Sequence, residues 1–133
     1  MAAAKMSVAE LERFLHEEFP QAFSDGDITI ESADGETCLL RRRFDERMLR
    51  PGGTVSGPTL MAMADFAMYV VLLSAIGPVG LAVTTNLNIN FLRKPKRCDL
   101  IAEAKILKLG KRLAVMEVNL FSDGVDEPVA HVT

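Results

Sequence analysis

Residues 59–76, TLMAMADFAMYVVLLSAI, constrain the fold more than any other part of the chain. The run carries a single charge, Asp65, and between Pro51 and Leu92 only Tyr69 offers a second acid or base. A helix that is apolar nearly all round must be covered on several sides. A carboxylate inside it is costly unless it faces a cleft or finds a partner. Asp65 is therefore the first candidate for a functional residue.

The same run is long enough to raise the possibility of a membrane span, but three features argue against it. It lies at the lower limit of length for a transmembrane helix. Asp65 would be expensive at the centre of a bilayer. The flanking SGP and GPVG segments have no lysine or arginine to fix an orientation. We therefore predict a buried core helix.

The remaining segments predict one further helix and six strands. Ser7 is a plausible N-cap, and Glu10 completes a capping box for a short amphipathic helix that ends near Pro20. Residues 27–44 predict a hairpin with its turn at ADGE, and residues 45–58 a loop rich in glycine and proline. Alternating patterns predict strands over residues 81–94, 98–110, 113–122 and 128–133.

The predicted order is α-β-β-α-β-β-β-β, without repeats or linkers. A curved antiparallel sheet is the natural cover for a single apolar helix. We predict an α+β fold in one domain, residues 1–133, with the long helix wrapped by the sheet. Arg41, Arg42 and Arg43 form a basic cluster, but a strand points them to alternate faces, which favours a solvated strand end over an anion site.

Composition excludes several classes of function. The formal net charge is −3, and no basic block provides an electrostatic footprint for nucleic acid. Cys38 and Cys98 make neither a disulfide framework nor a zinc cluster, which favours reduced thiols in a cytoplasmic protein. The N-terminal residues do not form a signal peptide. His16 and His131 lie at opposite ends of the chain, without metal-ligand spacing. We expect neither a metal nor a separate cofactor.

Three stretches carry a family resemblance: RPGGTVSGPTLMAMADFAMY, VTTNLNINFLRKP and KLGKRLAVMEVNLFSDG. They resemble the hotdog-fold acyl-CoA thioesterases, in particular the phenylacetate-pathway branch related to 4-hydroxybenzoyl-CoA thioesterase. The most specific part is a glycine, Gly57, followed eight residues later by Asp65 in the apolar helix. The resemblance implies a helix wrapped by a sheet, protomers joined edge to edge with two sites at the dimer interface, and dimers that often pair into tetramers.

The resemblance also implies roles for individual residues. Asp65 matches the catalytic carboxylate, which acts as general base on water or as nucleophile. Gly57 matches the glycine whose backbone N–H polarises the thioester carbonyl. Thr84 matches a hydroxyl residue that orients water and comes from the facing protomer. Segments matching Arg93–Lys94 and Lys111–Arg112 usually lie near the phosphates and pantetheine of coenzyme A.

The chain departs from the family pattern N-P-x-G-x-x-H-G-G at three positions. Arg50 stands where an asparagine is usual, Ser56 replaces the histidine, and Pro58 replaces the second glycine. Pro58 has no N–H, but proline suits the first turn of a helix. We count Arg50, Ser56 and Pro58 among the expected substrate-binding residues. Asn90 belongs to a polar strand face, together with Asn86 and Asn88, that could be exposed or could reach the site.

The residues by themselves support the same chemistry. Thioester hydrolysis needs a water activator or nucleophile and a donor for the developing oxyanion. Asp65 can be the first, and N–H groups at the helix start can be the second, aided by the helix dipole. We expect apolar surroundings to raise the pKa of Asp65, and Met61, Met68 and Leu72 could accept an acyl or aryl group.

Two hypotheses remain. In the first, the chain is a homo-oligomeric thioesterase that hydrolyses a fatty- or aryl-acyl-CoA to free acid and coenzyme A. In the second, it is a non-catalytic acyl-CoA-binding or structural hotdog protein, with Asp65 a structural acid. Asp65 would then be paired with Arg50, or bonded to polar groups such as those of Thr84 and Asn88. A coenzyme A-linked transcriptional sensor is less well supported, because no DNA-binding helix pair precedes the domain.

Overall fold

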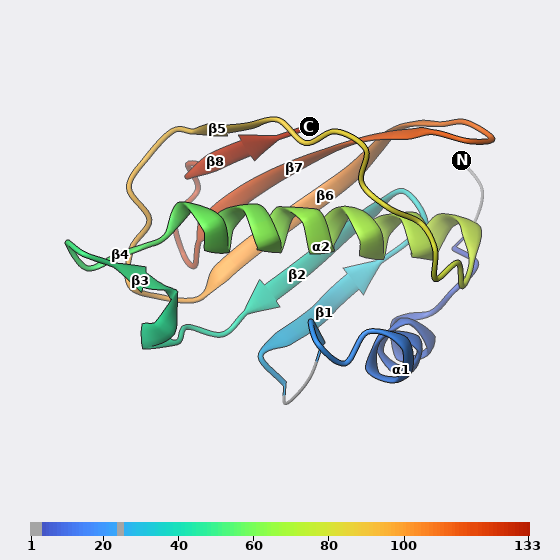
Figure 1. Cartoon of the computed structure of the whole chain (residues 1–133), viewed down its shortest axis with the longest axis horizontal. Helices are drawn as coiled ribbons and strands as arrows, with labels where there is room; N and C mark the ends of the chain where they lie inside the picture. The colour runs from blue at the N-terminus through green and yellow to red at the C-terminus, as the bar shows by residue number, and fades with distance from the viewer. Residues whose placement is uncertain (1–3, 24–25) are drawn as a thin grey trace.

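A long helix, α2 (Gly57–Ile76), packs against one face of an antiparallel sheet in the computed structural model (Figure 1). The model describes residues 4–23 and 26–133. Residues 1–3, which belong to the predicted domain, and residues 24–25 lie outside the described part. The observed order of the main elements is the predicted one, and the predicted wrapping of the helix by the sheet is confirmed.

Six strands form the sheet, in the order β1-β2-β6-β7-β8-β5. They are β1 (Ile28–Ala33), β2 (Thr37–Arg42), β5 (Ile89–Phe91), β6 (Leu100–Leu109), β7 (Ala114–Ser122) and β8 (Ala130–Val132). Every neighbouring pair runs antiparallel. The strand at one edge, β5, has a neighbour on one side only, so it presents unpaired backbone groups on the other.

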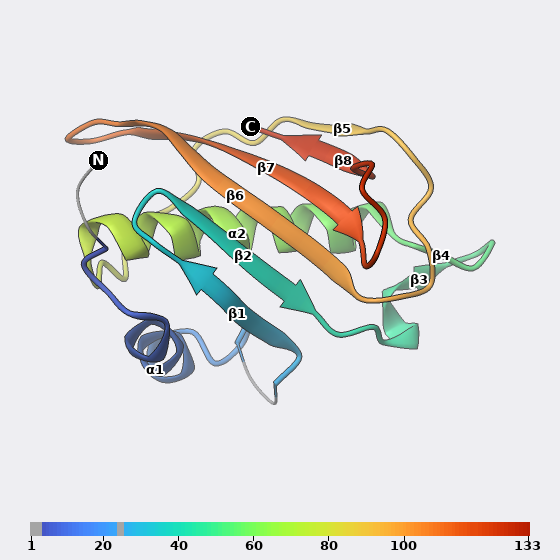
Figure 2. The ribbon, with the colours of Figure 1, turned by 180° about the vertical axis from the view of Figure 1, so that it is seen from behind.

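The core lies between the sheet and α2. Strand residues alternate between the two faces of the sheet, and Leu100, Ala102, Ala104 and Ile106 of β6 all face the helix and are buried. Figure 2 shows the sheet from its outer face, with α2 behind it. Cys38 also points inward, where its thiol donates to the carbonyl oxygen of Ala67 and burial raises its pKa to about 12. Both cysteines are free, and Cys38 packs as predicted.

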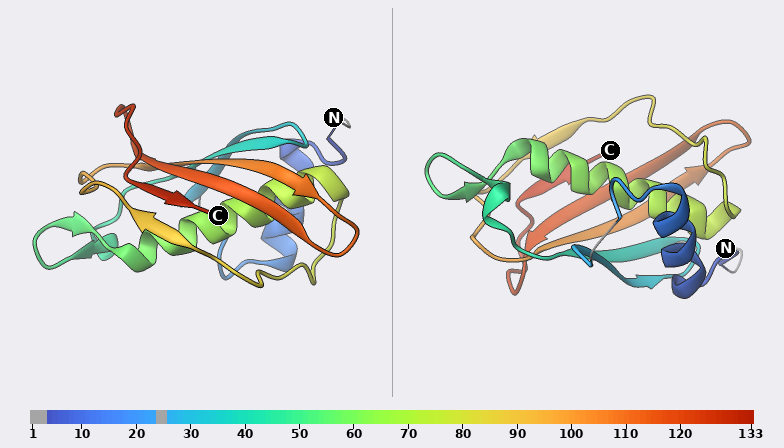
Figure 3. Two further views of the ribbon diagram at one scale, coloured as in Figure 1. Left: turned by 90° about the horizontal axis from the view of Figure 1, so that it is seen from above. Right: turned by 60° about the horizontal axis from the view of Figure 1, so that its bottom comes forward.

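The first helix, α1 (Val8–Glu18), forms as the sequence predicts. The Ser7 hydroxyl accepts from the N–H of Glu10, and the Glu10 carboxylate accepts from the N–H of Ser7, which completes the capping box. Leu11 and Leu15, one turn apart, are fully buried. The helix thereby closes one flank of the core beside β1 (Figure 3).

One stripe of α2 stays outside the core. Its members recur every three or four residues and are exposed or half-buried: Pro58, Met61, Ala62, Asp65, Tyr69, Leu72 and Ile76. The helix is long and apolar enough to cross a membrane, yet most of its residues are buried in the protein. It is therefore a core helix, as predicted, and Asp65 lies on its open stripe.

The segment between α2 and β5 differs from the sequence prediction. A strand was expected over residues 81–94, but only Ile89–Phe91 pairs within the sheet. Residues 77–87, which we call the strap, leave the sheet and run along α2 (Figures 1 and 3). Alternation alone could not reveal this, because the strap makes its contacts with the helix: Tyr69 donates to the carbonyl of Val79 at 3.5 Å.

The predicted loop before α2 contains a short 3-10 helix, η1 (Glu46–Met48), and a two-stranded ribbon. The ribbon pairs β3 (Leu49–Arg50) with β4 (Thr54–Val55). Gly52 and Gly53 have φ of 101° and 77° in its turn, a backbone conformation that favours glycine. The ribbon is joined to the start of α2, because the N–H of Ser56 donates to the carbonyl of Met48 at 2.8 Å.

Ser56 is the N-cap of α2. Its hydroxyl accepts from the N–H of Thr59 at 3.3 Å and bonds the Thr59 hydroxyl at 2.8 Å. Pro58 occupies the first turn, where its missing N–H costs nothing. The substitution of histidine by serine thus has a structural purpose, because serine is among the best N-caps.

Arg41 lies on the outer face of the sheet, surrounded by acids. Its guanidinium contacts the carboxylates of Glu31, Asp99 and Asp123 at 3.3, 3.1 and 2.9 Å. The hydrogen bonds from Arg41 lower the pKa of Asp123. An arginine already shared by three carboxylates does not offer an anion site, which agrees with the solvated strand end predicted for this cluster.

We predict that Ser56→Ala destabilises the fold through the lost cap, by about 1 kcal/mol. Thermal unfolding monitored by circular dichroism measures the change. Ser56→Asp is the matched control, because its carboxylate can cap the same N–H and suits the positive end of the helix dipole. Equal melting temperatures for wild type and Ser56→Ala would contradict the capping role.

We also predict that Arg41→Met lowers the melting temperature at pH 7. A carboxyl whose pKa is lowered by folding contributes stability above its unfolded pKa, near 3.9, and loses it as the pH falls through the folded value. The difference in melting temperature between wild type and Arg41→Met should therefore become smaller below about pH 4. Melting curves from pH 3 to pH 7 test this, with Arg43→Met as a control. A difference that stays constant with pH would rule out the ionic contribution.

Candidate functional site

A hollow of about 290 Å³ opens beside Asp65 on the uncovered stripe of α2. Met61, Ala62 and Asp65 line it from the helix, and Thr84 and Leu87 line it from the strap. Apart from the carboxylate and the hydroxyl, its walls are apolar. The hollow thus places one reactive carboxylate next to a surface that can hold an apolar group.

The Asp65 carboxylate accepts a short hydrogen bond from the Thr84 hydroxyl of the same chain. A facing protomer is therefore not needed to bring Thr84 to Asp65, in contrast to what the family resemblance implied. The bond fixes Oδ1 and leaves Oδ2 without a described partner. Thr84 can thus orient the carboxylate while one oxygen stays available for a proton or a carbon atom.

No described cation lies within ion-pair distance of Asp65. Of the arrangements expected for a structural Asp65, the pair with Arg50 is absent from the described contacts, whereas the bond to Thr84 is present. Asp65 is also exposed in the single chain rather than enclosed by apolar side chains. Its tolerance in an apolar helix follows from this position on the open stripe, where water solvates the charge.

The first turn of α2 presents one available backbone donor. Among the described residues, the N–H of Ser56 donates to Met48, that of Thr59 to the Ser56 hydroxyl, and that of Leu60 to the Ser56 carbonyl. Pro58 has no N–H. The N–H of Gly57 is left without a described acceptor, at the positive end of the helix dipole.

Gly57 and Asp65 of one chain are too far apart to act on the same atom. Eight residues of α-helix span roughly 12 Å, whereas an attacking group and an oxyanion donor must each come within about 3 Å of one carbonyl group. A site that uses both residues therefore combines Asp65 of one copy with Gly57 of another.

The expected substrate-binding cations lie at two ends of the molecule. Arg50 is exposed on the ribbon, and Lys94 is exposed in the loop after β5. Arg93 is engaged by Glu127 at 3.0 Å and by the carbonyl of Pro128 at 2.9 Å. The exposed Lys111–Arg112 turn joins β6 to β7 beyond the other end of α2, and Figure 1 shows the two regions apart.

Asn90 is not brought to Asp65. It pairs in register with His131 of β8, between Ile89 and Phe91, whose partners Val132 and Ala130 are buried. The asparagine therefore points to the outer face of the sheet, away from α2. Met68, named as a candidate acyl contact, is buried in the core, whereas Met61 does line the hollow.

Two residues near the site were not singled out from the sequence. Leu87 lines the hollow from the strap. Phe91 lies against Gly57, where an added Cβ would meet its Cζ at 3.3 Å. In the sequence, Leu87, Ile89 and Phe91 alternate with the asparagines and so share one face of a strand, but this pattern does not show which of them meets the start of α2.

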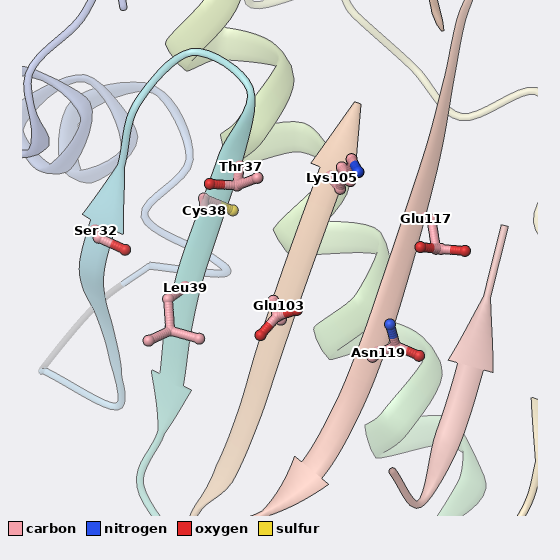
Figure 4. Close-up of a pocket in the computed structure, with 8 residues that line it drawn as sticks. All are labelled: Ser32, Thr37, Cys38, Leu39, Glu103, Lys105, Glu117 and Asn119. Atoms are coloured by element: carbon pink, nitrogen blue, oxygen red, sulfur yellow. The ribbon is translucent and has the colours of Figure 1, made fainter. Parts of the chain in front are cut away.

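A larger hollow, of about 370 Å³, lies on the outer face of the sheet and not beside Asp65. Strands β1, β2, β6 and β7 line it (Figure 4). Its lining residues are Ser32, Thr37, Cys38, Leu39, Glu103, Lys105, Glu117 and Asn119. It is a shallow polar surface, and the Cys38 thiol beneath it stays protonated, so it offers no activated nucleophile.

Comparisons with known proteins agree on one family. The family model of the thioesterase superfamily matches residues 52–129, more than half of the chain. A candidate esterase of Saccharolobus solfataricus is 29% identical over 117 residues, which cover 87% of this chain and 75% of that protein.

Two solved structures share the fold. A candidate thioesterase from Silicibacter sp. is 41% identical with a TM-score of 0.87, over 97% of this chain and 89% of that one. A thioesterase-like protein from Streptococcus pneumoniae, solved with coenzyme A, is 22% identical with a TM-score of 0.75, over 92% and 91% of the two chains. Together with the matched family model, the helix and sheet arrangement assigns this chain to the thioesterase superfamily of hotdog-fold proteins.

Proposed function

We propose that the protein hydrolyses an acyl-CoA thioester to a free acid and coenzyme A. The observation that carries the proposal is the Asp65 carboxylate, oriented by Thr84 and unpaired with any described cation, at an apolar hollow on α2. The related structure solved with coenzyme A supports this ligand class. A cytoplasmic location fits an acyl-CoA substrate.

The chemistry can follow either of two routes. As general base, Asp65 takes a proton from water while the water oxygen bonds to the thioester carbon. As nucleophile, its free oxygen bonds to that carbon, and water later hydrolyses the mixed anhydride. In both routes the carbon–sulfur bond breaks and the thiolate of coenzyme A leaves, to be protonated. The Gly57 N–H stabilises the oxyanion in each case.

The acyl group would enter the hollow formed by Met61, Ala62 and Leu87. These walls favour an apolar acyl or aryl group over a charged one, because a buried charge without a partner is costly. The negative phosphates of coenzyme A would stay outside and meet exposed cations, either Arg50 and Lys94 at one end of the molecule or Lys111 and Arg112 at the other.

The active form in this proposal is at least a homodimer. Gly57 and Asp65 of a single chain lie roughly 12 Å apart along the helix, so each site needs two copies. The open stripe of α2 and the strap also expose apolar side chains to water, with Leu81 91% and Val83 80% exposed. The unpaired edge of β5 lies next to this surface, so pairing of two β5 edges would cover both features.

We predict that Asp65→Asn removes turnover while the protein stays folded and still binds acyl-CoA. Loss of a general base lowers kcat by roughly 10²- to 10⁴-fold. Release of free thiol from short, medium and aryl acyl-CoAs measures turnover, and calorimetry with a non-hydrolysable thioether analogue measures binding.

The same measurements decide between the two hypotheses. Tight binding without wild-type turnover would support an acyl-CoA-binding protein, for which the replacement of the usual asparagine and histidine by Arg50 and Ser56 gives a reason. Neither binding nor turnover would support a structural role.

We predict further that two inactive variants restore activity when mixed as dimers. If each site joins Asp65 of one copy to Gly57 of the other, a heterodimer of Asp65→Asn and Gly57→Val has one site with both defects and one intact site. Random re-association should then return about a quarter of wild-type activity. Refolding the variants together measures this, with each variant refolded alone as the control. No recovery from confirmed heterodimers would refute the shared site.

A further inference from the structure

Phe91 lies against the residue that carries the proposed oxyanion donor. It ends the edge strand β5 and faces the helix side of the sheet, opposite the buried Ala130 of β8. A Cβ built on Gly57 would meet its ring atoms Cζ and Cε1 at 3.3 and 3.4 Å. The ring therefore occupies the space that a side chain at residue 57 would need.

Most helix-facing side chains of the sheet are fully buried, but Phe91 is 55% exposed. One part of its ring contacts the first turn of α2, and another part remains open. The ring thus forms a wall at the edge of the open surface, against the residue that carries the available N–H.

The backbone gives no other reason for glycine at residue 57. Its φ does not lie in the left-handed region, in contrast to Gly52, Gly53 and Gly77. Alanine is the better helix former at such a position. Contact with Phe91 is therefore the described steric constraint at residue 57, because a Cβ there would require the ring to give by a few tenths of an ångström.

We propose that Phe91 is a positioning residue for the thioesterase reaction. It keeps the approach to the Gly57 N–H narrow and apolar, so that the thioester oxygen, rather than water, occupies the donor. A hydrogen bond in a site that excludes water stabilises developing charge more strongly. This inference rests on the proposed function, and it adds a residue to which the chemistry had given no role.

Kinetics of Phe91→Ala test the positioning role. We expect kcat to fall on the order of tenfold, with a smaller change in KM, because the shielded bond matters most in the transition state. Phe91→Leu should recover part of the loss, since it restores an apolar wall. Phe121→Ala, the same change at a half-buried ring on the outer face of the sheet, should leave kcat unchanged.

The contact between Phe91 and Gly57 predicts that the effect of Gly57→Ala on the melting temperature depends on the residue at position 91. Gly57→Ala should lower both the melting temperature and kcat in the wild-type background, where the Cβ presses on the ring. In the Phe91→Ala background, the same substitution should leave the melting temperature unchanged or raise it, and kcat should fall no further. The four proteins form a double-mutant cycle that reports coupling between the two residues.

The outcomes separate this inference from the proposed function. The role of Phe91 alone would be overturned if the effects of Phe91→Ala and Gly57→Ala are additive. It would also be overturned if kcat is unchanged in Phe91→Ala while Asp65→Asn abolishes turnover. A wild-type protein without turnover on any acyl-CoA would overturn both. Two results together would establish the role of Phe91. The first is a loss of kcat in Phe91→Ala that Phe91→Leu partly recovers. The second is a destabilising effect of Gly57→Ala in the wild-type background that disappears or reverses in the Phe91→Ala background.

Discussion

The fold depends on the covering of one helix that is apolar on every side. The sheet covers the buried part of α2 through inward residues such as Ala104 and Val118, which are fully buried. Helix α1 closes one flank, and the strap crosses part of the remaining stripe. None of these elements covers the stripe completely, and Asp65 lies on its exposed part. The same incomplete cover leaves open both the hollow beside Asp65 and the apolar surface that the proposed second copy would cover.

Much of this arrangement follows from the sequence, because local patterns specify it. The capping box at Ser7 and the alternation of residues 100–106 each indicate one element and one buried face. The position of residues 77–87 does not follow, although residues from 81 onward were predicted to belong to a strand. Their placement is decided by contacts with α2, such as the bond from Thr84 to Asp65. Tertiary contacts of this kind override a local pattern.

The sequence points to individual residues of the candidate site more readily than to their surroundings and mutual positions. Asp65 stood out because it is the only charge in an apolar run, and Gly57 because the family resemblance places a glycine eight residues before the acid. The environment of Asp65 was harder to foresee. Apolar surroundings were expected, with either Arg50 or polar groups such as that of Thr84 as partner, yet the carboxylate is exposed and bonded to Thr84. Sequence spacing also could not assign a face to Asn90, because that depends on the register of β5 with β8.

The substitutions at the start of α2 leave the proposed chemistry with a single backbone donor. Serine at residue 56 satisfies the N–H of Thr59, and proline at residue 58 has none, so only Gly57 can receive an oxyanion. The direction of that donor is set by the bond from Ser56 to Met48 and by the contact with Phe91. The ribbon before α2 and the edge strand β5 therefore hold the donor from two sides. In the proposed function, this arrangement would let a chain without the usual asparagine and histidine direct one N–H toward a thioester.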